Sequence, residues 1–352
     1  MKILLYGDTH FSQSSSVIIG SSSSLEGRLQ YLINSFEWMY SKAKEYNVDC
    51  IIDLGDLSDS PRLTASEITG ITRALKYNQD IPEYHLLGNH ERQTEDGTIN
   101  SVNFIDLLPN HHLIKETKQL NNEITFVPYR EYVDGDLDDI QRTHYAFSHI
   151  DIFGANVGGW ALKAGMSPEY LLSKFDIVIN GHIHNHSYVV DTPLKKIINL
   201  GSISGQNFSS KGTPHIGLLD TETDELSFID NPHGLSFYNE TCNSISDIIK
   251  ASKAIGETGR KVAVQIKVPM NLVEDARRIL NNNDNILVFK IRIQMEKSQL
   301  LREEIEEIEK VNTSEGGFNK LRDFVNAKKK LPFDRESILA MVDELERNKL
   351  SS

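Results

Sequence analysis

Short apolar runs, each followed by a polar cluster, recur through the first half of the chain. They lie at residues 3–6, 50–54, 84–87, 145–147 and 177–180. Apolar runs of this length, bounded by glycine or polar residues, are typical of strands buried on both faces of a sheet. In such sheets, ligands bind at the carboxyl ends of the strands. Because a polar cluster ends every run, the pattern predicts a site along one edge of a sheet.

Helical periodicity separates the early strands. Apolar residues recur at spacings of three and four in the segments 25–46 and 65–77. Later segments have the pattern of plain strands, at residues 124–127, 196–200, 215–220 and 226–230, the last two as a hairpin. The predicted fold is therefore α/β at first and β-rich later, with sheets flanked by helices.

The length and the cysteines limit the class of protein. The 352 residues correspond to about two domains at roughly 150 residues each. The sequence contains no run of about 18 apolar residues, so we expect no membrane-spanning helix. The apolar run that begins at Met1 is too short for a signal peptide. Cys50 and Cys242 are expected to be reduced thiols. These features predict a cytoplasmic protein with no membrane partner.

The charge is distributed unevenly along the chain. Residues 1–240 carry 17 Lys and Arg against 32 Asp and Glu, whereas residues 241–352 carry 20 against 18. This shift, together with the Asn-Pro-His-Gly turn at 231–234, predicts a domain boundary near residues 235–245. A net charge of −13 argues by itself against a nucleic acid partner. Bound divalent ions would offset part of the N-terminal acidity, so the argument from net charge is weak.

The polar clusters share side chains that bind metals. Asp-x-His and His-x-His spacings place both side chains on the same side of an extended segment. Asp, Asn and His ligands without a thiolate suit Mn²⁺ first, with Fe²⁺, Mg²⁺ and Zn²⁺ as alternatives. Asp56 is suited to bridging two ions at ~3.5–4 Å, a pair that activates a water and neutralises a phosphate. The candidate ligands are Asp8, His10, Asp56, Asn89, His149, His182 and His184.

The clusters resemble the five motifs of the calcineurin-like metallophosphoesterases in order and spacing over roughly residues 1–230. The motifs are Asp8-x-His10, Gly55-Asp56-x-x-Asp59, Gly88-Asn89-His90-Glu91, Ser148-His149 and Gly181-His182-Ile183-His184. The resemblance implies a β-sandwich flanked by helices. It also implies two divalent metal ions in one site.

The resemblance assigns roles to these residues. One ion would be held by Asp8, His10, Asp56 and His184. The second would be held by Asp56, Asn89, His149 and His182. His90 would be the catalytic acid at the leaving oxygen, with Asp59 and Glu91 as carboxylates behind the ligands.

Two features distinguish between members of this family. Protein serine/threonine phosphatases continue the second motif as Asp-Arg-Gly, whereas Ser60, Pro61 and Arg62 follow Asp59 here. Residues 201–208 are similar to a Gly-Ser segment of the SbcD-type nuclease subunits. Three basic residues near the predicted site loops are candidate contacts to the DNA backbone, namely Arg62, Arg92 and Lys211.

The rest of the chain also resembles the SbcD-type layout. We expect a nuclease domain at 1–235, a small α+β capping domain at 236–295 and C-terminal helices at 296–352. The capping domain is expected to contain strands at 261–268 and 286–293 and a helix at 272–280. The C-terminal helices have narrow apolar stripes that suit docking to the coiled coil of an SbcC-like ATPase. The resemblance further implies a homodimer formed through the helices of the nuclease domain.

The sequence therefore predicts a Mn²⁺-dependent DNA nuclease, with exonuclease or endonuclease activity, that acts with an SbcC-like ATPase in double-strand-break repair and recombination. It would work in the cytoplasm of a bacterial cell or of a phage-infected host. One alternative is a stand-alone phosphomonoesterase or cyclic-nucleotide phosphodiesterase. The other is a metal-free scaffold that recruits an ATPase.

Overall fold

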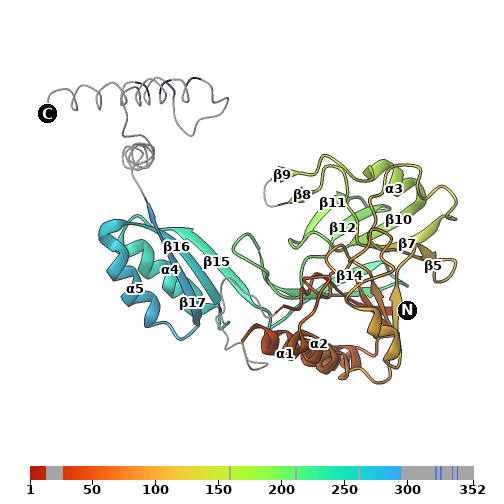
Figure 1. The fold of residues 1–352 in the computed structure, drawn as a ribbon, viewed down its shortest axis with the longest axis horizontal. Coiled ribbons are helices and arrows are strands. Elements are labelled where there is room, and N and C mark those ends of the chain that lie inside the picture. Colours follow the sequence, from red (N-terminus) through yellow and green to blue (C-terminus); the bar gives the residue numbers. More distant parts are fainter. Residues whose placement is uncertain are drawn as a thin grey trace, which may run out of the picture.

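The computed structural model describes residues 1–12, 27–157, 160–210, 212–260 and 262–294, together with residues 322, 326, 335 and 339. Within these ranges the chain forms two large sheets, a smaller three-stranded sheet and a short hairpin (Figure 1). Two predictions lie outside the described residues. They are the DNA contact at Lys211 and, apart from the four isolated positions, the docking helices of 296–352.

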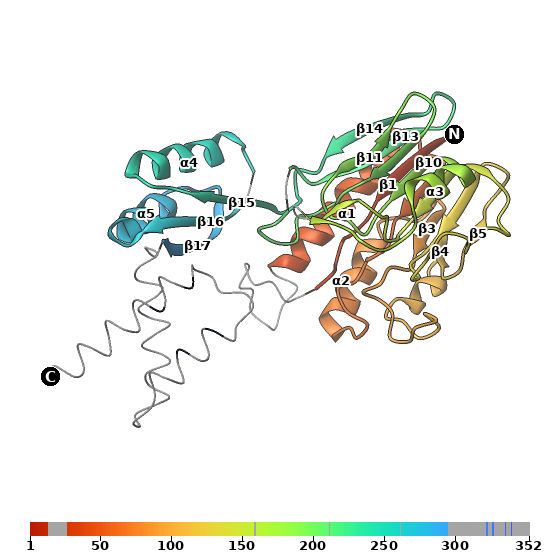
Figure 2. The same ribbon diagram turned by 90° about the horizontal axis from the view of Figure 1, so that it is seen from above.

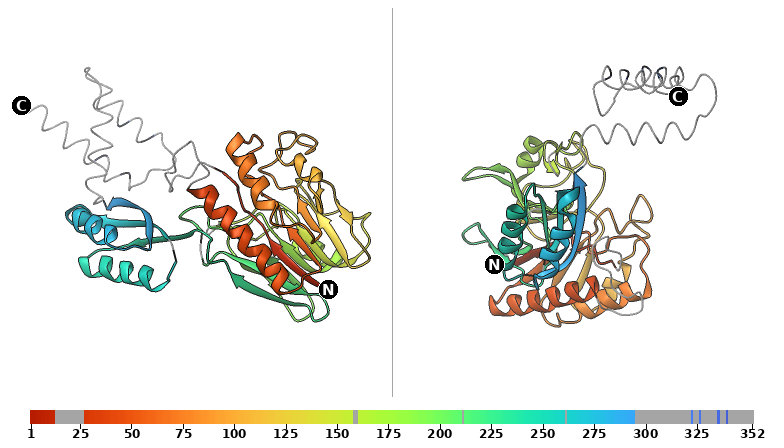
Figure 3. Two further views of the ribbon diagram at one scale, coloured as in Figure 1. Left: turned by 90° about the horizontal axis from the view of Figure 1, so that it is seen from below. Right: turned by 90° about the vertical axis from the view of Figure 1, so that its left-hand side faces the viewer.

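The first large sheet joins the N-terminal strands to a late hairpin. Its strand order is β14-β13-β1-β2-β3-β4, with β1 to β4 parallel and β13 antiparallel to β1. The strands are β1 (Lys2–Tyr6), β2 (Cys50–Asp53), β3 (Glu83–Leu86), β4 (His111–Ile114), β13 (His215–Asp220) and β14 (Glu225–Asp230). Two helices, α1 (Arg28–Glu45) and α2 (Ala65–Leu75), lie side by side over its outer face (Figure 3). Both helices and the hairpin were predicted and are confirmed.

The second large sheet carries the later strands. Its order is β11-β12-β10-β7-β6-β5, in which β6, β7, β10 and β12 are parallel. The strands are β5 (Lys118–Gln119), β6 (Ile124–Val127), β7 (Thr143–Ser148), β10 (Phe175–Asn180), β11 (Ser187–Asp191) and β12 (Lys196–Asn199). Helix α3 (Pro168–Lys174) packs on this sheet, where its Leu171 shares a hydrophobic cluster with Phe175 and Val178 of β10.

Alternation along β1 explains why the sheets stack. Ile3 and Leu5 face the second sheet and join a core with Phe126 and Phe147, whereas Leu4 and Tyr6 belong to the core under α1 and α2. The four side chains from Ile3 to Tyr6 are fully buried. A strand covered on both faces needs apolar residues at every position. The fold is therefore an α/β sandwich of two mixed sheets flanked by helices, which confirms the predicted fold class.

A separate module follows the sandwich. Strands β15 (Ser236–Thr241), β16 (Val262–Pro269) and β17 (Ile286–Gln294) form an all-parallel sheet connected through α4 (Ile245–Glu257) and α5 (Val273–Asn281). It has its own core, which includes Ile248, Val264 and Leu280. Figure 2 shows the module beside the sandwich, reached through β15. The predicted strands and helix at 261–293 are present, whereas β15 and α4 were not predicted.

The remaining elements are short. They are the hairpin of β8 (Asn156–Val157) and β9 (Trp160–Ala161) and the 3₁₀ turns Asn103–Leu107 and Met270–Leu272. Among the helices in the described ranges, none has the length and apolar character needed to cross a bilayer.

Candidate metal centre

The seven predicted ligands meet at one edge of the sandwich. Asp8 and His10 follow β1, Asp56 follows β2, Asn89 follows β3, His149 follows β7, and His182 and His184 follow β10. Backbone hydrogen bonds hold the first two loops together, from Asp8 N to Gly55 O at 2.9 Å and from His10 N to Asp56 O at 2.9 Å. The carboxyl ends of the parallel strands thus bring together residues that are up to 176 positions apart in the sequence.

The loops adopt a strained backbone where they carry ligands. Asp8, His10, Asp56 and His182 have φ values of 50°, 50°, 55° and 67°. This left-handed region costs a non-glycine residue about 1–3 kcal/mol, although Asp, Asn and His tolerate it better than most. Strain of this kind persists only where the surrounding structure enforces it. Because four of the candidate ligands share this strained conformation, the fold places their side chains at the expense of a relaxed backbone.

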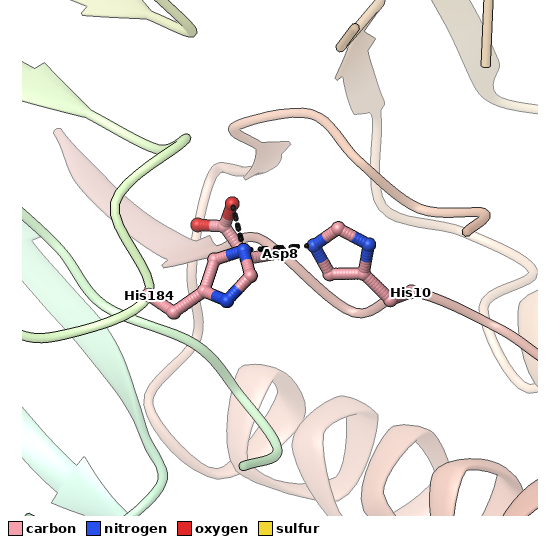
Figure 4. A group of neighbouring side chains, drawn as sticks. All are labelled: Asp8, His10 and His184. Atoms are coloured by element: carbon pink, nitrogen blue, oxygen red, sulfur yellow. Dashed lines mark hydrogen bonds and ion pairs between the residues drawn. The ribbon is translucent and has the colours of Figure 1, made fainter. Parts of the chain in front are cut away.

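The first group of ligands comprises Asp8, His10 and His184 (Figure 4). The Nε2 atoms of His10 and His184 face each other at 3.0 Å, and His184 Nε2 lies 3.8 Å from Asp8 Oδ1. Burial and the neighbouring His10 lower the pKa of His184 to about 3, which keeps its ring neutral. Burial raises the pKa of Asp8 to about 7. Neither Asp8 oxygen has a hydrogen-bond partner among the described residues.

The second group is centred on Asp56. His149 Nδ1 lies 2.6 Å from the carbonyl oxygen of Leu54 and donates to it, which directs Nε2 toward Asp56 Oδ2 at 3.2 Å. Asn89 Oδ1 lies 3.1 Å from His149 Nε2 and 3.0 Å from His182 Nδ1. Burial by itself lowers the pKa of His149, but the carboxylate of Asp56 outweighs it and raises that pKa to about 10.

Two features of this site fit a pair of divalent cations: the unpartnered oxygens of Asp8 and the ring nitrogens that face one another. A buried carboxylate without partners and ring nitrogens that face one another at hydrogen-bond distance both call for a cation. The donor set of Asp, Asn and His is one that divalent ions of the Mn²⁺, Fe²⁺ and Zn²⁺ kind accept. Asp56 lies between the groups, with Oδ2 3.7 Å from His10 Nε2 and 3.2 Å from His149 Nε2. The buried clusters are therefore consistent with a dimetal site.

Three carboxylates hold the candidate ligands or their loops in place through hydrogen bonds. Asp59 Oδ1 accepts from His10 Nδ1 at 3.0 Å, and Glu91 accepts from the backbone nitrogens of Ser58 and Gly88 at 2.9 and 2.8 Å. Both residues were predicted in this supporting role. Asp151 was not predicted. Its Oδ1 lies 3.0 Å from His182 Nε2, and the available signal was its position two residues after His149.

His90 differs from the ligands in exposure. Its side chain is 39% exposed, whereas that of His149 is fully buried. The backbone nitrogen of His90 donates to Asp56 Oδ1 at 3.0 Å, and its Nδ1 lies 3.2 Å from the carbonyl oxygen of Asp59. The ring packs edge to face with that of His10 at 4.6 Å between centroids, and one of its nitrogens lies within 4.8 Å of candidate ligand atoms of His10 and Asp56.

Two of the predicted DNA contacts, Arg92 and Arg62, belong to the described residues, and they differ in their position relative to this centre. The Arg92 guanidinium lies 5.4 Å from the centroid of the Tyr129 ring, and that ring packs beside His149 and His182. Arg92 therefore belongs to the rim of the second ligand group. Arg62 is exposed on the loop after Asp59, and the structure gives it no contact with a ligand.

Sequence reasoning also missed a polar scaffold beneath the Asp8 loop. Gln206 Nε2 and Ser202 Oγ each donate to the carbonyl oxygen of Asp8 at 2.7 Å. Arg28 is buried and contacts Gln206 and the carbonyl oxygen of His10. Burial lowers the pKa of Arg28 to about 10. The segment 201–208 thus supports the loop that carries two ligands.

Comparison with known proteins agrees with this geometry. The family described as Calcineurin-like phosphoesterase matches residues 1–186. No curated protein matches the chain. Similar solved structures include a protein from Thermus thermophilus, with 11% identity over 65% of this chain and 98% of the other and a TM-score of 0.42. A dimetal phosphatase from Danio rerio has 12% identity over 65% and 98%, with a TM-score of 0.37. The phosphoesterase Yfce from E. coli has 12% identity over 66% and 100%, with a TM-score of 0.33.

Proposed function

Since the chain belongs to the calcineurin-like phosphoesterase family, we propose that its metal-dependent phosphoesterase activity is directed at the phosphodiester bonds of DNA. The family and the buried Asp and His groups account for the phosphoesterase chemistry. The choice of DNA, the preference for Mn²⁺ and a role in double-strand-break repair and recombination are the parts that we propose.

One observation carries the choice of a polymeric substrate. The segment 201–208 supports the Asp8 loop and also contacts the start of the three-stranded module. Gly205 N donates to Leu235 O at 2.9 Å, and the rings of Phe208 and Phe237 pack edge to face at 5.3 Å. A module fastened beside a metal site suits a substrate that extends beyond one phosphate. We therefore assign residues 236–295 the role of a cap that guides DNA.

The charge pattern supports the same choice. Residues 241–352 carry more basic than acidic side chains, in contrast to the acidic sandwich. Each Lys or Arg that contacts a phosphate adds salt-dependent affinity for DNA. Arg92 at the rim of the second ligand group is the described residue best placed for such a contact, and Arg62 is a second candidate.

In the proposed mechanism, Asp8, His10, Asp56 and His184 would hold one ion, and Asp56, Asn89, His149 and His182 the other. When bound, such ions supply an activated water and neutralise the phosphate that it attacks. Asp59 and Asp151 orient His10 and His182 through their outer ring nitrogens. His90 Nε2 donates a proton to the leaving oxygen, while Asp59 holds Nδ1 of the same ring.

Two further assignments extend the proposal. Residues 296–352 would dock on the coiled coil of an SbcC-like ATPase, in line with the resemblance. The sandwich would form a homodimer through α1 and α2, and the exposed Ile68 and Tyr77 offer apolar surface there. Truncation before Gly316 should then abolish co-purification of the ATPase while the cleavage of a small diester persists.

The direct test uses the purified full-length chain with Mn²⁺. It is assayed on double-stranded DNA, single-stranded DNA, a small phosphodiester and a phosphopeptide. Cleavage of DNA in preference to the small diester supports the proposal. Turnover of the small substrates alone would replace it with a stand-alone phosphoesterase.

A further inference from the structure

We propose that Glu83, His85 and His111 form a second metal site, separate from the dimetal centre, that binds one zinc ion between the first large sheet and its helices. The three side chains lie on neighbouring strands β3 and β4 and are all buried. Their candidate ligand atoms lie within 4.8 Å of one another. None of the three belongs to the motifs that define the catalytic site.

The register of the sheet assembles this cluster. Glu83 and His85 are two residues apart on β3, so their side chains share one face of the sheet. Glu83 is paired with His111 on β4, and His85 is paired with Asp53 on β2. Side chains in register on parallel strands lie about 5 Å apart, which is close enough for joint ligation of one ion.

The ring nitrogens point their lone pairs at one place. His85 Nδ1 lies 3.0 Å from Asp53 Oδ2 and donates to it, and the outer nitrogen of His111 is hydrogen-bonded to the backbone of Leu75. The inner atoms, His85 Nε2 and His111 Nδ1, then face each other at 3.0 Å. A neutral imidazole has one donor and one acceptor nitrogen, so both inner nitrogens are acceptors. Two acceptors at this distance need either a shared proton or a metal ion between them.

The distances match a zinc site. Glu83 Oε2 lies 3.5 Å from His111 Nδ1, and Glu83 Oε1 lies 3.8 Å from His85 Nε2. With Zn–N and Zn–O bonds of about 2.0–2.1 Å, the ligand atoms of a tetrahedral ion are roughly 3.3 Å apart. Comparable spacings of 3.0 to 3.8 Å separate the ligand atoms of the dimetal centre. Two His and one Glu are a known donor set for zinc, with the fourth position left to water or a second oxygen.

The charge balance favours a dication over a proton. Asp53 and Glu83 are both fully buried. Within the described ranges, their recorded hydrogen-bond and ion-pair partners are His85, His111, Tyr6, Tyr40, Asn78 and the Gly55 amide. None of these is a permanent cation. One proton on His85 would leave a net negative charge, whereas a zinc ion neutralises both carboxylates.

The surroundings provide the other parts of a metal site. Asp53 orients His85 as outer carboxylates orient ligating histidines. Tyr6 donates to Oε1 of Glu83 and Asn78 donates to Oε2, while the Tyr40 hydroxyl lies 3.2 and 3.0 Å from the two oxygens, so the carboxylate is held in one orientation. A cavity of about 430 Å³, lined by Asn78 and His111 among others, lies beside the cluster.

Metal counting tests the proposal. Metal-free full-length protein is loaded with Zn²⁺, freed of excess and analysed by inductively coupled plasma mass spectrometry. His111→Gln should bind one ion fewer per chain than the wild type. The matched control is His112→Gln, at an exposed position of the same strand, and it should bind the wild-type number. Equal numbers for His111→Gln and the wild type would overturn the proposal.

A second variant covers the case in which His111→Gln does not fold. Asp56→Ala removes the bridging ligand of the dimetal centre, so one ion should remain, held at the buried cluster. With Co²⁺ in place of Zn²⁺, this remaining ion should give the intense visible absorption of four-coordinate cobalt. An Asp56→Ala protein without bound metal, or with only the weak spectrum of six-coordinate cobalt, would contradict the proposal. Neither result depends on whether the enzyme cleaves DNA.

Discussion

The outer ring nitrogens of three histidines among the candidate ligands are held by oxygen acceptors. Asp59 holds His10, the Leu54 carbonyl holds His149, and Asp151 holds His182. This arrangement fixes each tautomer, so that the remaining nitrogen presents a lone pair to the centre. The two carboxylates also make their histidines stronger ligands. The orientation of each of these rings therefore depends on its outer acceptor.

Asp151 provides the clearest test of this arrangement. Asp151→Asn keeps the size of the side chain but replaces the carboxylate that orients His182. We expect affinity for the ion at the second ligand group to fall by about 10–100-fold. The measurement is the Mn²⁺ concentration that gives half of the maximal phosphodiesterase activity. The control is Asp139→Asn, an exposed carboxylate outside the site, and an unchanged Mn²⁺ requirement in Asp151→Asn would exclude the proposed role.

His90 should separate catalysis from metal binding. His90→Ala removes the proposed proton donor but leaves the backbone nitrogen that contacts Asp56. Turnover should drop by about 10²–10⁴-fold, in line with the loss of general acid catalysis. Metal content should stay at the wild-type level, because the exposed ring is not assigned to either ion. A variant that lost its metals together with its activity would make His90 a ligand instead.

The convergence of the candidate ligands could be predicted because each follows an apolar run, where chemistry and local pattern coincide. Asp59 and Glu91 were found for the same reason, since they belong to the same short motifs. Arg28 was missed because its contacts with His10 and Gln206 depend on how α1 packs. The buried cluster of Glu83, His85 and His111 was missed because strand register, and not sequence spacing, brings it together.

At the scale of elements, a polar link joins the two large sheets near the amino end of β7, away from the candidate metal centre. His144 on β7 lies 2.9 Å from Asp224, in the turn between β13 and β14, and 3.1 Å from Asp176 on β10. Burial lowers the pKa of His144, but hydrogen bonds to the two carboxylates outweigh it, and the net shift is upward. Both ring nitrogens face carboxylates, so the protonated ring suits this position.

The link should make stability depend on pH. A histidine whose pKa is higher in the folded than in the unfolded state stabilises the fold fully below the unfolded value of about 6.5. The contribution is lost as the pH rises through the raised value of the folded state. His144→Gln should therefore lower the free energy of unfolding at pH 6 and change it less at pH 9. The side chain is 36% exposed, so the difference should stay below about 1 kcal/mol.

Urea denaturation at the two pH values measures this effect. His112→Gln serves as the control, because that ring is exposed and stacks on Tyr84 without a carboxylate contact recorded in the described structure. If His144→Gln lost the same stability at both pH values, we would conclude that His144 contributes through packing alone.

Elements differed in how well their patterns predicted them. The strand at β1 was clear because every residue from Ile3 to Tyr6 is apolar and buried. In contrast, β15 is half-buried at its start and exposed at its end, so its polar residues hide the alternation. Helix α4 begins at Ile245 behind the cap of Ser244, yet only its buried stripe of Ile248, Ala251 and Ile255 is apolar in register. This narrow apolar stripe is why the sequence analysis does not predict the helix.

For the whole molecule, the question is whether the three-stranded module serves the chemistry of the sandwich. Gly205 lies in the segment that supports the Asp8 loop, and its backbone nitrogen donates to Leu235 O, just before the module begins. A Cβ atom at this position would lie 2.5 Å from the carbonyl oxygen of Leu235 and 2.8 Å from the Phe237 ring. A backbone oxygen at that distance cannot turn aside as a flexible side chain does. Gly205→Ala must therefore displace β15, and with it the module, from the metal site.

Gly205→Ala should lower the cleavage of DNA much more than the turnover of a small phosphodiester, because only the long substrate needs the cap. We expect the ratio of the two rates to fall by about tenfold or more, in keeping with the loss that small displacements cause in positioned reactions. The control is Gly256→Ala on α4, where an added Cβ meets only Asn283, at 3.9 Å. Metal content confirms that the site survives. If both rates fell together, the segment 201–208 would act on the metal loop alone, and the module would have no separate role in binding DNA.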